Sequence, residues 1–346
     1  MAYQREYPTR IRIAVVGIGS HTYRNLLPAL HHLPVEVVAF CDVNQALVEK
    51  TALEYGCRAY TSTQAMYGSE KLEAVLISVS PQLHPTLACE AFDAGLHVWM
   101  EKPPAMRTSE VDTLLAHRKD RVAVVGFKKI FMPGAAKAKE VITSAKYGHP
   151  ISLLAVYPMT IPENGAKILE DRTFTNWLGN SCHPLSLMLH LGGPVGAVTT
   201  YRNRTAGGEG GMVVLEFANG TLGNFHFASG PLPTERYSVF GPHWNLHIDN
   251  CMKVSLQRGI PSVYGKTTSY IPEGDDTGSV VWEPQNSVAT LENMALFTQG
   301  MFFELKHFCD AILDQKPATL GTLEFARQVM QVYEAALIST GERIVL

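Results

Sequence analysis

The feature that most constrains the fold is a repeated alternation of short apolar strands with helical segments, which begins at Ile11. Apolar runs typical of β-strands occupy residues 11–16, 35–41, 74–80, 97–100 and 122–126. Helical patterns lie between them, for example over residues 45–55 and 84–94. The strand runs are continuously apolar rather than alternating, which indicates a parallel sheet covered by helices on both faces. The first part of the chain is therefore predicted to be a doubly wound α/β domain.

The pattern changes after Phe127, where strand segments begin to alternate or to carry aromatic residues between glycine turns. Such segments favour an antiparallel or mixed sheet with one exposed face. A chain of 346 residues is too long for one ordinary core. We therefore expect a dinucleotide-binding domain over residues 1–127 and a second, α+β domain with an open sheet over residues 128–346. The run at 269–279 is predicted to be a mobile excursion.

Composition excludes several classes of partner. The formal charge is -3, which provides no basic face for nucleic acid. The six cysteines are scattered without C-x-x-C spacing, so we expect reduced thiols. No apolar signal core opens the chain, and no apolar run reaches the roughly 18 residues of a membrane helix. We expect a cytoplasmic protein that acts on a small molecule and binds neither nucleic acid nor membrane.

A glycine pair, Gly17 and Gly19, lies between the first strand and the following helix. Glycines there let the backbone turn sharply and approach a pyrophosphate, which binds the amides at a helix N-terminus. Thr22 stands where the third glycine of G-x-G-x-x-G is expected and is a candidate helix cap. A plain tight turn is the alternative explanation. The candidate cofactor-binding residues of this loop are Gly17, Ile18, Gly19, Ser20 and His21.

Asp42 ends the second strand, at the place where an acid accepts the ribose hydroxyls of an adenosine. An N-cap for the next helix is the alternative, and both roles can hold together. No arginine follows, since the next residues are Val43 and Asn44. An acid without a neighbouring guanidinium repels a 2'-phosphate, so NAD is preferred to NADP.

Polar residues follow the next two strands at the predicted carboxyl edge of the sheet, where open α/β sheets bind ligands. Ser78, Ser80 and Pro81 form a rim there, and His84 is a candidate either for cofactor contact or for a local helix cap.

Glu101 and Lys102 follow the next strand and precede two prolines. Alone, they would be read as a solvated surface pair. At the sheet edge, a lysine can donate hydrogen bonds to a substrate oxygen and stabilise a developing alkoxide.

Several segments together resemble the family of glucose-fructose oxidoreductase and inositol dehydrogenase (Gfo/Idh/MocA). They run in order over nearly the whole chain: VVGIGS, FCDVN, ISVSPQLH, AGLHVWMEKPPA, VGFKKIFMPGA, LEFANGTLG and FCDAILDQKPATLGTLEFARQVMQVYEAA. The resemblance implies a Rossmann domain, a second domain with an open mixed sheet, and NAD or NADP. It also implies oxidation of a secondary hydroxyl on a sugar, cyclitol or polyol, and a homodimer or homotetramer formed through the open sheet.

The resemblance also implies roles for particular residues. Lys102 corresponds to the catalytic lysine, with a cis peptide to Pro103, and Lys129 to a basic substrate-binding position. His183 falls at the position of the catalytic histidine. Gly179 and Ser186 stand where many relatives carry aspartates. His183 must therefore act without that acid or with another partner, which an imidazole with an ordinary pKa of about 6.5 can do.

Three further residues are candidates for substrate binding. Asn180 offers an amide, Trp177 a flat apolar face and Tyr157 a pocket wall, while core packing is the alternative for Trp177. No metal is expected, because the spacing of His243 and His247 does not converge on one face of a strand.

The leading hypothesis is an NAD-dependent dehydrogenase in which Lys102 polarises the reacting oxygen and His183 takes its proton. A second hypothesis is an enzyme of the same family that recycles NAD while it cleaves a glycosidic bond or inverts a centre. A third is a non-catalytic dinucleotide sensor.

Overall fold

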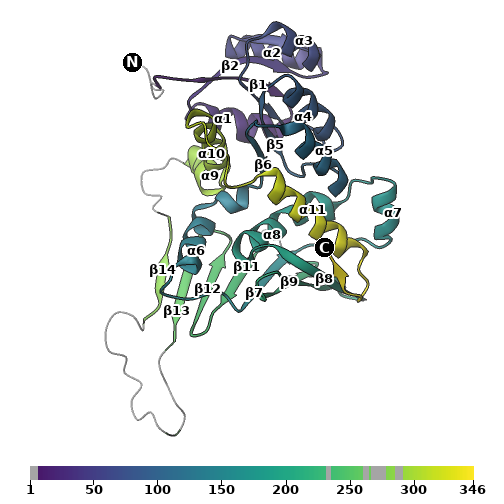
Figure 1. The fold of residues 1–346 in the computed structure, drawn as a ribbon, viewed down its shortest axis with the longest axis vertical. Coiled ribbons are helices and arrows are strands. Elements are labelled where there is room, and N and C mark those ends of the chain that lie inside the picture. The colour runs from purple at the N-terminus through teal and green to yellow at the C-terminus, as the bar shows by residue number, and fades with distance from the viewer. Residues whose placement is uncertain (1–6, 231–234, 260–264, 266–277, 285–290) are drawn as a thin grey trace. The chain divides into compact units, whose positions relative to one another are not determined.

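The computed structural model describes residues 7–230, 235–259, 265, 278–284 and 291–346 (Figure 1). Most of residues 269–279, predicted above to be a mobile excursion, lie outside the described residues. The chain divides into two compact units, each described below by itself.

The first unit is built on a six-stranded sheet in the order β3-β2-β1-β4-β5-β6. Every neighbouring pair of its strands is parallel, which confirms the predicted doubly wound architecture. Strand β3 was not expected, because it is short and two of its three residues are exposed. The strands are β1 (Ile11–Val16), β2 (Val35–Cys41), β3 (Arg58–Tyr60), β4 (Ala74–Ile77), β5 (His97–Glu101) and β6 (Ala123–Gly126).

Helices connect these strands, and their ends follow local chemistry. The side chain of Asn44 caps α2 by accepting a hydrogen bond from the Leu47 amide at 3.1 Å. The same helix ends at Gly56, whose φ of 66° suits glycine. The helices of this part of the chain are η1 (Thr22–Leu26), α1 (Leu27–Leu30), α2 (Gln45–Tyr55), α3 (Thr63–Ser69), α4 (His84–Asp93), α5 (Thr108–Arg118) and η2 (Lys128–Phe131).

The second unit is built on a nine-stranded mixed sheet in the order β14-β13-β12-β11-β7-β10-β9-β8-β15. Strands β7 and β10 pair in parallel, and the other neighbours are antiparallel. The strands are β7 (Ser152–Pro158), β8 (Val195–Thr205), β9 (Gly208–Phe217), β10 (Leu222–Ala228), β11 (Arg236–Phe240), β12 (Trp244–Asp249), β13 (Lys253–Arg258), β14 (Val280–Trp282) and β15 (Ile344–Val345). Helix α6 (Pro133–Thr143) contacts β12 and β13, and α8 (Asn176–Gly192) contacts β7 and β10.

The division into units differs from the two continuous domains expected from the sequence. The first unit runs to Phe131 and also includes Lys167–Phe174 and Leu291–Gln331. It therefore holds α9 (Leu291–Thr298), α10 (Met301–Leu313) and the first part of α11 (Leu323–Ile338), while α7 (Gly165–Glu170) spans a boundary. Helix α10 packs on β5, β6 and η2 through an apolar face that includes the buried Leu305 and Phe308. A sequence pattern shows that such a face exists, but not which sheet it covers.

Two expectations about the chain as a whole can be compared with the structure. All six cysteines lie among the described residues, and all are free thiols, as predicted. Over the described ranges, no helix combines the length and the apolar character needed to cross a bilayer.

Candidate active site

The glycine loop after β1 is shaped to approach a ligand. Gly17 has φ of 88°, and a Cβ on it would lie 2.2 Å from the carbonyl oxygen of Ser78. Only glycine fits there. A Cβ on Gly19 would meet no described atom within 4 Å, so this backbone faces open space. Thr22 replaces the third glycine, and its hydroxyl donates to the Gly17 carbonyl at 2.7 Å. The threonine thus fixes the loop from within rather than capping the helix through its amides.

Asp42 joins this loop to the end of β2. One carboxylate oxygen accepts the Ile18 amide at 2.7 Å, and the other accepts the Asn44 amide at 2.9 Å. The helix cap itself is Asn44, not Asp42. A half-buried carboxylate beside an exposed glycine is the arrangement that binds an adenosine ribose in a sheet of this order. Val43 is 93% exposed and uncharged, so the position offers no cation to a 2'-phosphate.

The rim after β4 divides into an accessible part and a buried part. Ser78 is half-buried and Ser80 is exposed, whereas Pro81 is buried. His84 is fully buried, and its Nδ1 lies 2.8 Å from the Pro103 carbonyl oxygen. Burial is the main reason why the pKa of His84 is lowered. His84 thus has no exposed surface, and its imidazole lies against the Lys102–Pro103 segment.

Glu101 and Lys102 end β5 at the same edge of the sheet. Glu101 is 8% exposed, and one of its oxygens accepts the Lys102 amide at 3.0 Å. The other oxygen lies 2.5 Å from Nε2 of His21 in the glycine loop. The structure therefore brings the loop and the E-K-P segment together. The peptide between Lys102 and Pro103 is cis, as the resemblance implied.

More charged groups gather beside this segment than the sequence indicated. Lys128 and the buried Lys129 lie in η2, directly after β6. Burial lowers the pKa of Lys128, and the charge of Lys129 lowers it further, while Glu304 and Glu101 oppose the shift. Glu304, on α10, is fully buried. Sequence reasoning missed it, although helical spacing places it on one face with Met301, Phe308 and Ala311.

His183 lies on helix α8 of the second unit, which begins at the N-cap Thr175. The helix contains no aspartate or glutamate, and His183 itself is 9% exposed. The Ser186 hydroxyl donates to the His183 carbonyl at 3.0 Å, so this hydroxyl does not replace a carboxylate. Pro184 lies inside the helix and leaves the Asn180 carbonyl without its usual intrahelical donor.

The remaining candidates of the second unit differ in accessibility. Asn180 and Tyr157 are partly exposed, and the Asn180 amide donates to the Asn176 side chain. Trp177 is fully buried and stacks on Phe225 with ring centroids 6.1 Å apart. Its indole N–H donates to a backbone carbonyl at 3.4 Å. This is the core-packing alternative, because the ring presents no exposed face to a sugar.

Metal-ligating side chains do not cluster in the part of the chain that the structure describes, where no group of three or more could hold an ion. His247 instead forms a hydrogen bond with Ser238 at 2.8 Å.

The chain is similar in sequence and in fold to known proteins. Residues 11–129 match the family described as "Oxidoreductase family, NAD-binding Rossmann fold". The chain is similar to the dTDP-3,4-didehydro-2,6-dideoxy-alpha-D-glucose 3-reductase of Streptomyces antibioticus, with 25% identity over 69% of this chain and 76% of that protein. It is also similar to the inositol 2-dehydrogenase of Salmonella typhimurium, with 28% identity over 44% of this chain and 48% of that protein.

A solved structure extends the likeness to both units. Levoglucosan dehydrogenase, in complex with NADH and L-sorbose, has a TM-score of 0.78 and covers 97% of this chain and 99% of its own. Its sequence identity is 16%, so this likeness concerns the fold. The family match covers residues 11–129, the part of the first unit that carries the glycine loop, Asp42 and the E-K-P segment. Through residues 11–129 the chain resembles the Gfo/Idh/MocA family of NAD-binding oxidoreductases.

Proposed function

We propose that this protein is an NAD-dependent dehydrogenase that interconverts a secondary hydroxyl and a ketone on a sugar, cyclitol or related polyol. The observation that carries the proposal is the joining of three features at one sheet edge. The open glycine loop, the Asp42 carboxylate and the Glu101–Lys102 pair are linked there by short hydrogen bonds and an ion-pair contact. The relatives named for inositol and for a deoxysugar support a polyhydroxylated substrate.

The residues present fit a dinucleotide. Gly19 leaves room for a pyrophosphate, and Asp42 lies where ribose hydroxyls can donate to it. The nicotinamide, when bound, supplies a hydride acceptor or donor. The uncharged neighbours Val43 and Asn44 favour NAD over NADP.

The chain's own residues then bind the substrate and move its proton. The Lys102 ammonium donates to the reacting oxygen and stabilises negative charge as it develops there. His183 accepts the hydroxyl proton on its imidazole during oxidation and returns it during reduction. The proposed contacts to the other hydroxyls are Lys129, Asn180 and Tyr157. Trp177, by contrast, packs α8 against the core through its stacking on Phe225. Glu101 and His21 orient the loop against the Lys102 segment.

The test is turnover by the purified protein on a panel of sugars, cyclitols and polyols, followed through the absorbance of reduced nicotinamide in both directions. We expect Lys102→Met to lower kcat/KM by about 10²–10³-fold. We expect His183→Asn to lower it by about 10²–10⁴-fold. Matched controls are Lys71→Met and His149→Asn, which change exposed residues of the same types. Turnover that Lys102→Met leaves unchanged would contradict the proposal.

The same experiment separates the two other hypotheses. Gly179 and the engaged Ser186 hydroxyl leave α8 without the usual acid, which keeps an altered net reaction open. Cleavage of a glycoside without accumulation of NADH would indicate an enzyme that recycles its cofactor. Binding of NAD without turnover of any panel member would favour a sensor.

A further inference from the structure

The carboxyl group of Glu304 is buried in the first unit, on helix α10. It is 0% exposed, and neither of its oxygens has a hydrogen-bond partner among the described residues. Its neighbours on the same face of α10 are the buried Met301, Phe308 and Ala311. An ionised carboxylate without hydrogen-bond donors is costly in such surroundings, so burial favours the neutral form of this group.

Glu304 lies directly behind the E-K-P segment. A Cβ built on Gly126 would lie 3.4 Å from its Oε1, and Gly126 is the register partner of Glu101 in the sheet. Helix α10 packs on β5, β6 and η2. The carboxyl is therefore within electrostatic reach of the residues that end β5 and follow β6.

The charged groups facing Glu304 come from two of these elements. Glu101 and Lys102, at the end of β5, act electrostatically on Glu304, and so does Lys128, which precedes Lys129 in η2. The described side chains of α9, residues 295–298, do not titrate, and neither do those of α1. His21 faces Glu101 from the glycine loop. Burial raises the pKa of Glu304 well above its ordinary value, Glu101 raises it further, and Lys128 and Lys102 oppose the shift.

The charge of Glu304 determines whether the Lys102 ammonium is attracted to a substrate oxygen alone or also to the Glu304 carboxylate. While Glu304 is neutral, it does not compete with a substrate oxygen for that ammonium. Once it is ionised, a buried carboxylate attracts both Lys102 and Lys128 more strongly than the same charge would in water. Loss of one proton from Glu304 therefore makes its carboxylate compete with the substrate oxygen for the Lys102 ammonium.

We propose that Glu304 is a positioning residue for Lys102: it holds a proton while Lys102 binds the substrate oxygen, and its ionisation draws the ammonium toward α10. The inference rests on the role proposed above for Lys102. The proton passes from the Glu304 carboxyl to solvent, and no bond to the substrate forms or breaks in this step.

Three measurements on the full chain test the inference, two of them without any substrate. Infrared difference spectra of the ligand-free protein should show the carbonyl stretch of a protonated carboxylic acid at neutral pH. That band should disappear in Glu304→Gln and persist in Glu70→Gln, a control at another buried glutamate. Absence of the band from the parent protein would overturn the inference.

The second measurement follows Lys102 itself. Its acetylation rate, resolved by mass spectrometry against the exposed Lys71, should stop rising with pH once Glu304 ionises. In Glu304→Gln, and in the apolar Glu304→Met, the rate should continue to rise. Equal pH dependence in the parent and in both variants would show that Glu304 does not position Lys102.

The third measurement is kcat/KM from about pH 6 to about pH 10, which spans the interval below the ordinary lysine value. We expect Glu304→Gln to lie within about threefold of the parent at neutral pH and to keep its activity to higher pH. A purely structural role would lower activity equally at every pH. If the parent turned over no substrate, the proposed function would fail, while the infrared and acetylation results would still decide this inference.

Discussion

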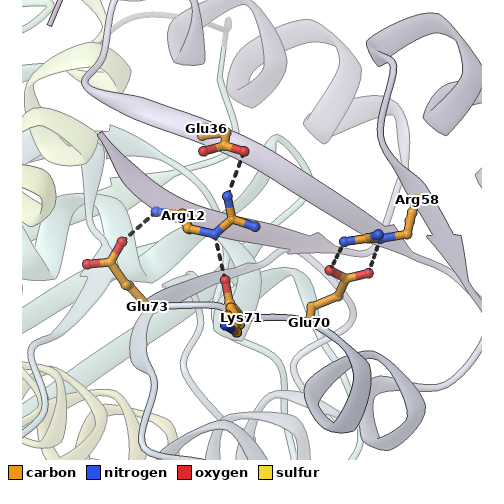
Figure 2. Close-up of polar contacts among 6 residues, drawn as sticks. All are labelled: Arg12, Glu36, Arg58, Glu70, Lys71 and Glu73. Atoms are coloured by element: carbon orange, nitrogen blue, oxygen red, sulfur yellow. Dashed lines mark hydrogen bonds and ion pairs between the residues drawn. The ribbon is translucent and has the colours of Figure 1, made fainter. Parts of the chain in front are cut away.

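Two buried glutamates of the first unit have opposite electrostatic surroundings. Glu70, at the end of α3, is 8% exposed and accepts hydrogen bonds from the Arg58 guanidinium and the Tyr60 hydroxyl, the latter at 2.5 Å (Figure 2 shows the Arg58 pair). Burial raises the pKa of Glu70, but these donors outweigh it and hold the pKa below its ordinary value. Glu304 has no such donor, and its pKa is raised. Burial alone therefore does not decide the charge of a carboxyl group.

The difference extends to the two edges of the first sheet. Near its amino edge, Arg12 pairs with Glu36 at 2.8 Å and donates to the Lys71 carbonyl, while its amide donates to Glu73 (Figure 2). These are surface pairs that contribute to local structure. At the opposite edge, where the strands end, the Glu304 side chain is affected by the charges of Glu101, Lys102 and Lys128. It forms a hydrogen bond with none of these three residues. On our proposal, a substrate oxygen completes that set of charges.

The largest expected effect breaks the packing that keeps Glu304 in place. In Gly126→Ala, the new methyl group would lie 2.9 Å from Cζ2 of the fully buried Trp99 as well as close to Glu304. Overpacking of this kind lowers the free energy of unfolding by about 1–3 kcal/mol, which urea unfolding measures. The control is Gly68→Ala in α3, where a Cβ meets nothing within 4 Å. Equal stability of the two variants would contradict this account of the site.

A smaller loss of stability is expected at Glu70, whose buried carboxylate accepts hydrogen bonds from Arg58 and Tyr60. Glu70→Gln should lower the free energy of unfolding by about 1 kcal/mol at neutral pH, because it weakens the bonds from Arg58 and Tyr60. The folded pKa of Glu70 is lowered, so its contribution is present above the ordinary value of 4.5 and is lost as pH falls through the folded pKa. Urea unfolding below that value should show the variant and the parent converging.

Glu304→Gln should change the free energy of unfolding with the opposite dependence on pH to that of Glu70→Gln. With a raised pKa, folded Glu304 keeps its proton where the unfolded chain has lost it, so the free energy of unfolding falls as pH rises through that interval. The glutamine variant lacks this fall. The stability of the variant relative to the parent should therefore increase with pH, and an identical pH slope would indicate that Glu304 is ionised in the folded protein.

The smallest effect is expected at the exposed amino edge. Arg12→Met removes the exposed ion pair with Glu36. Such surface ion pairs contribute about 0–1 kcal/mol to the free energy of unfolding. Thermal unfolding should shift only slightly, and added salt should reduce the difference between variant and parent. Activity should stay within about twofold of the parent, since Arg12 lies at the edge where no cofactor is proposed to bind. A large loss of activity would contradict the assignment of function to one edge.

Local patterns predicted the elements of the first sheet well. The continuous apolar runs indicated parallel strands, and five of the six strands of this sheet were placed to within a few residues. The helix at Gln45–Tyr55 was predicted with its observed bounds, and the helix at His84–Asp93 was predicted to within one residue. Strand β3 was missed because its residues are mostly exposed. The sequence also did not show that residues 291–331 belong to the first unit. That outcome depends on which strands the apolar face of α10 packs against.

Sequence patterns alone were enough to predict the order of the elements, the glycine loop with Asp42, the E-K-P segment and the resemblance to the Gfo/Idh/MocA family. These follow from spacings of a few residues, where backbone geometry limits what side chains can do. Tertiary contacts were needed to show that His84 lies against Pro103, that Trp177 is core, and that the pKa values of Glu70 and Glu304 shift in opposite directions. Burial and hydrogen-bond partners decide those outcomes, and both come from residues distant in the sequence that folding brings together.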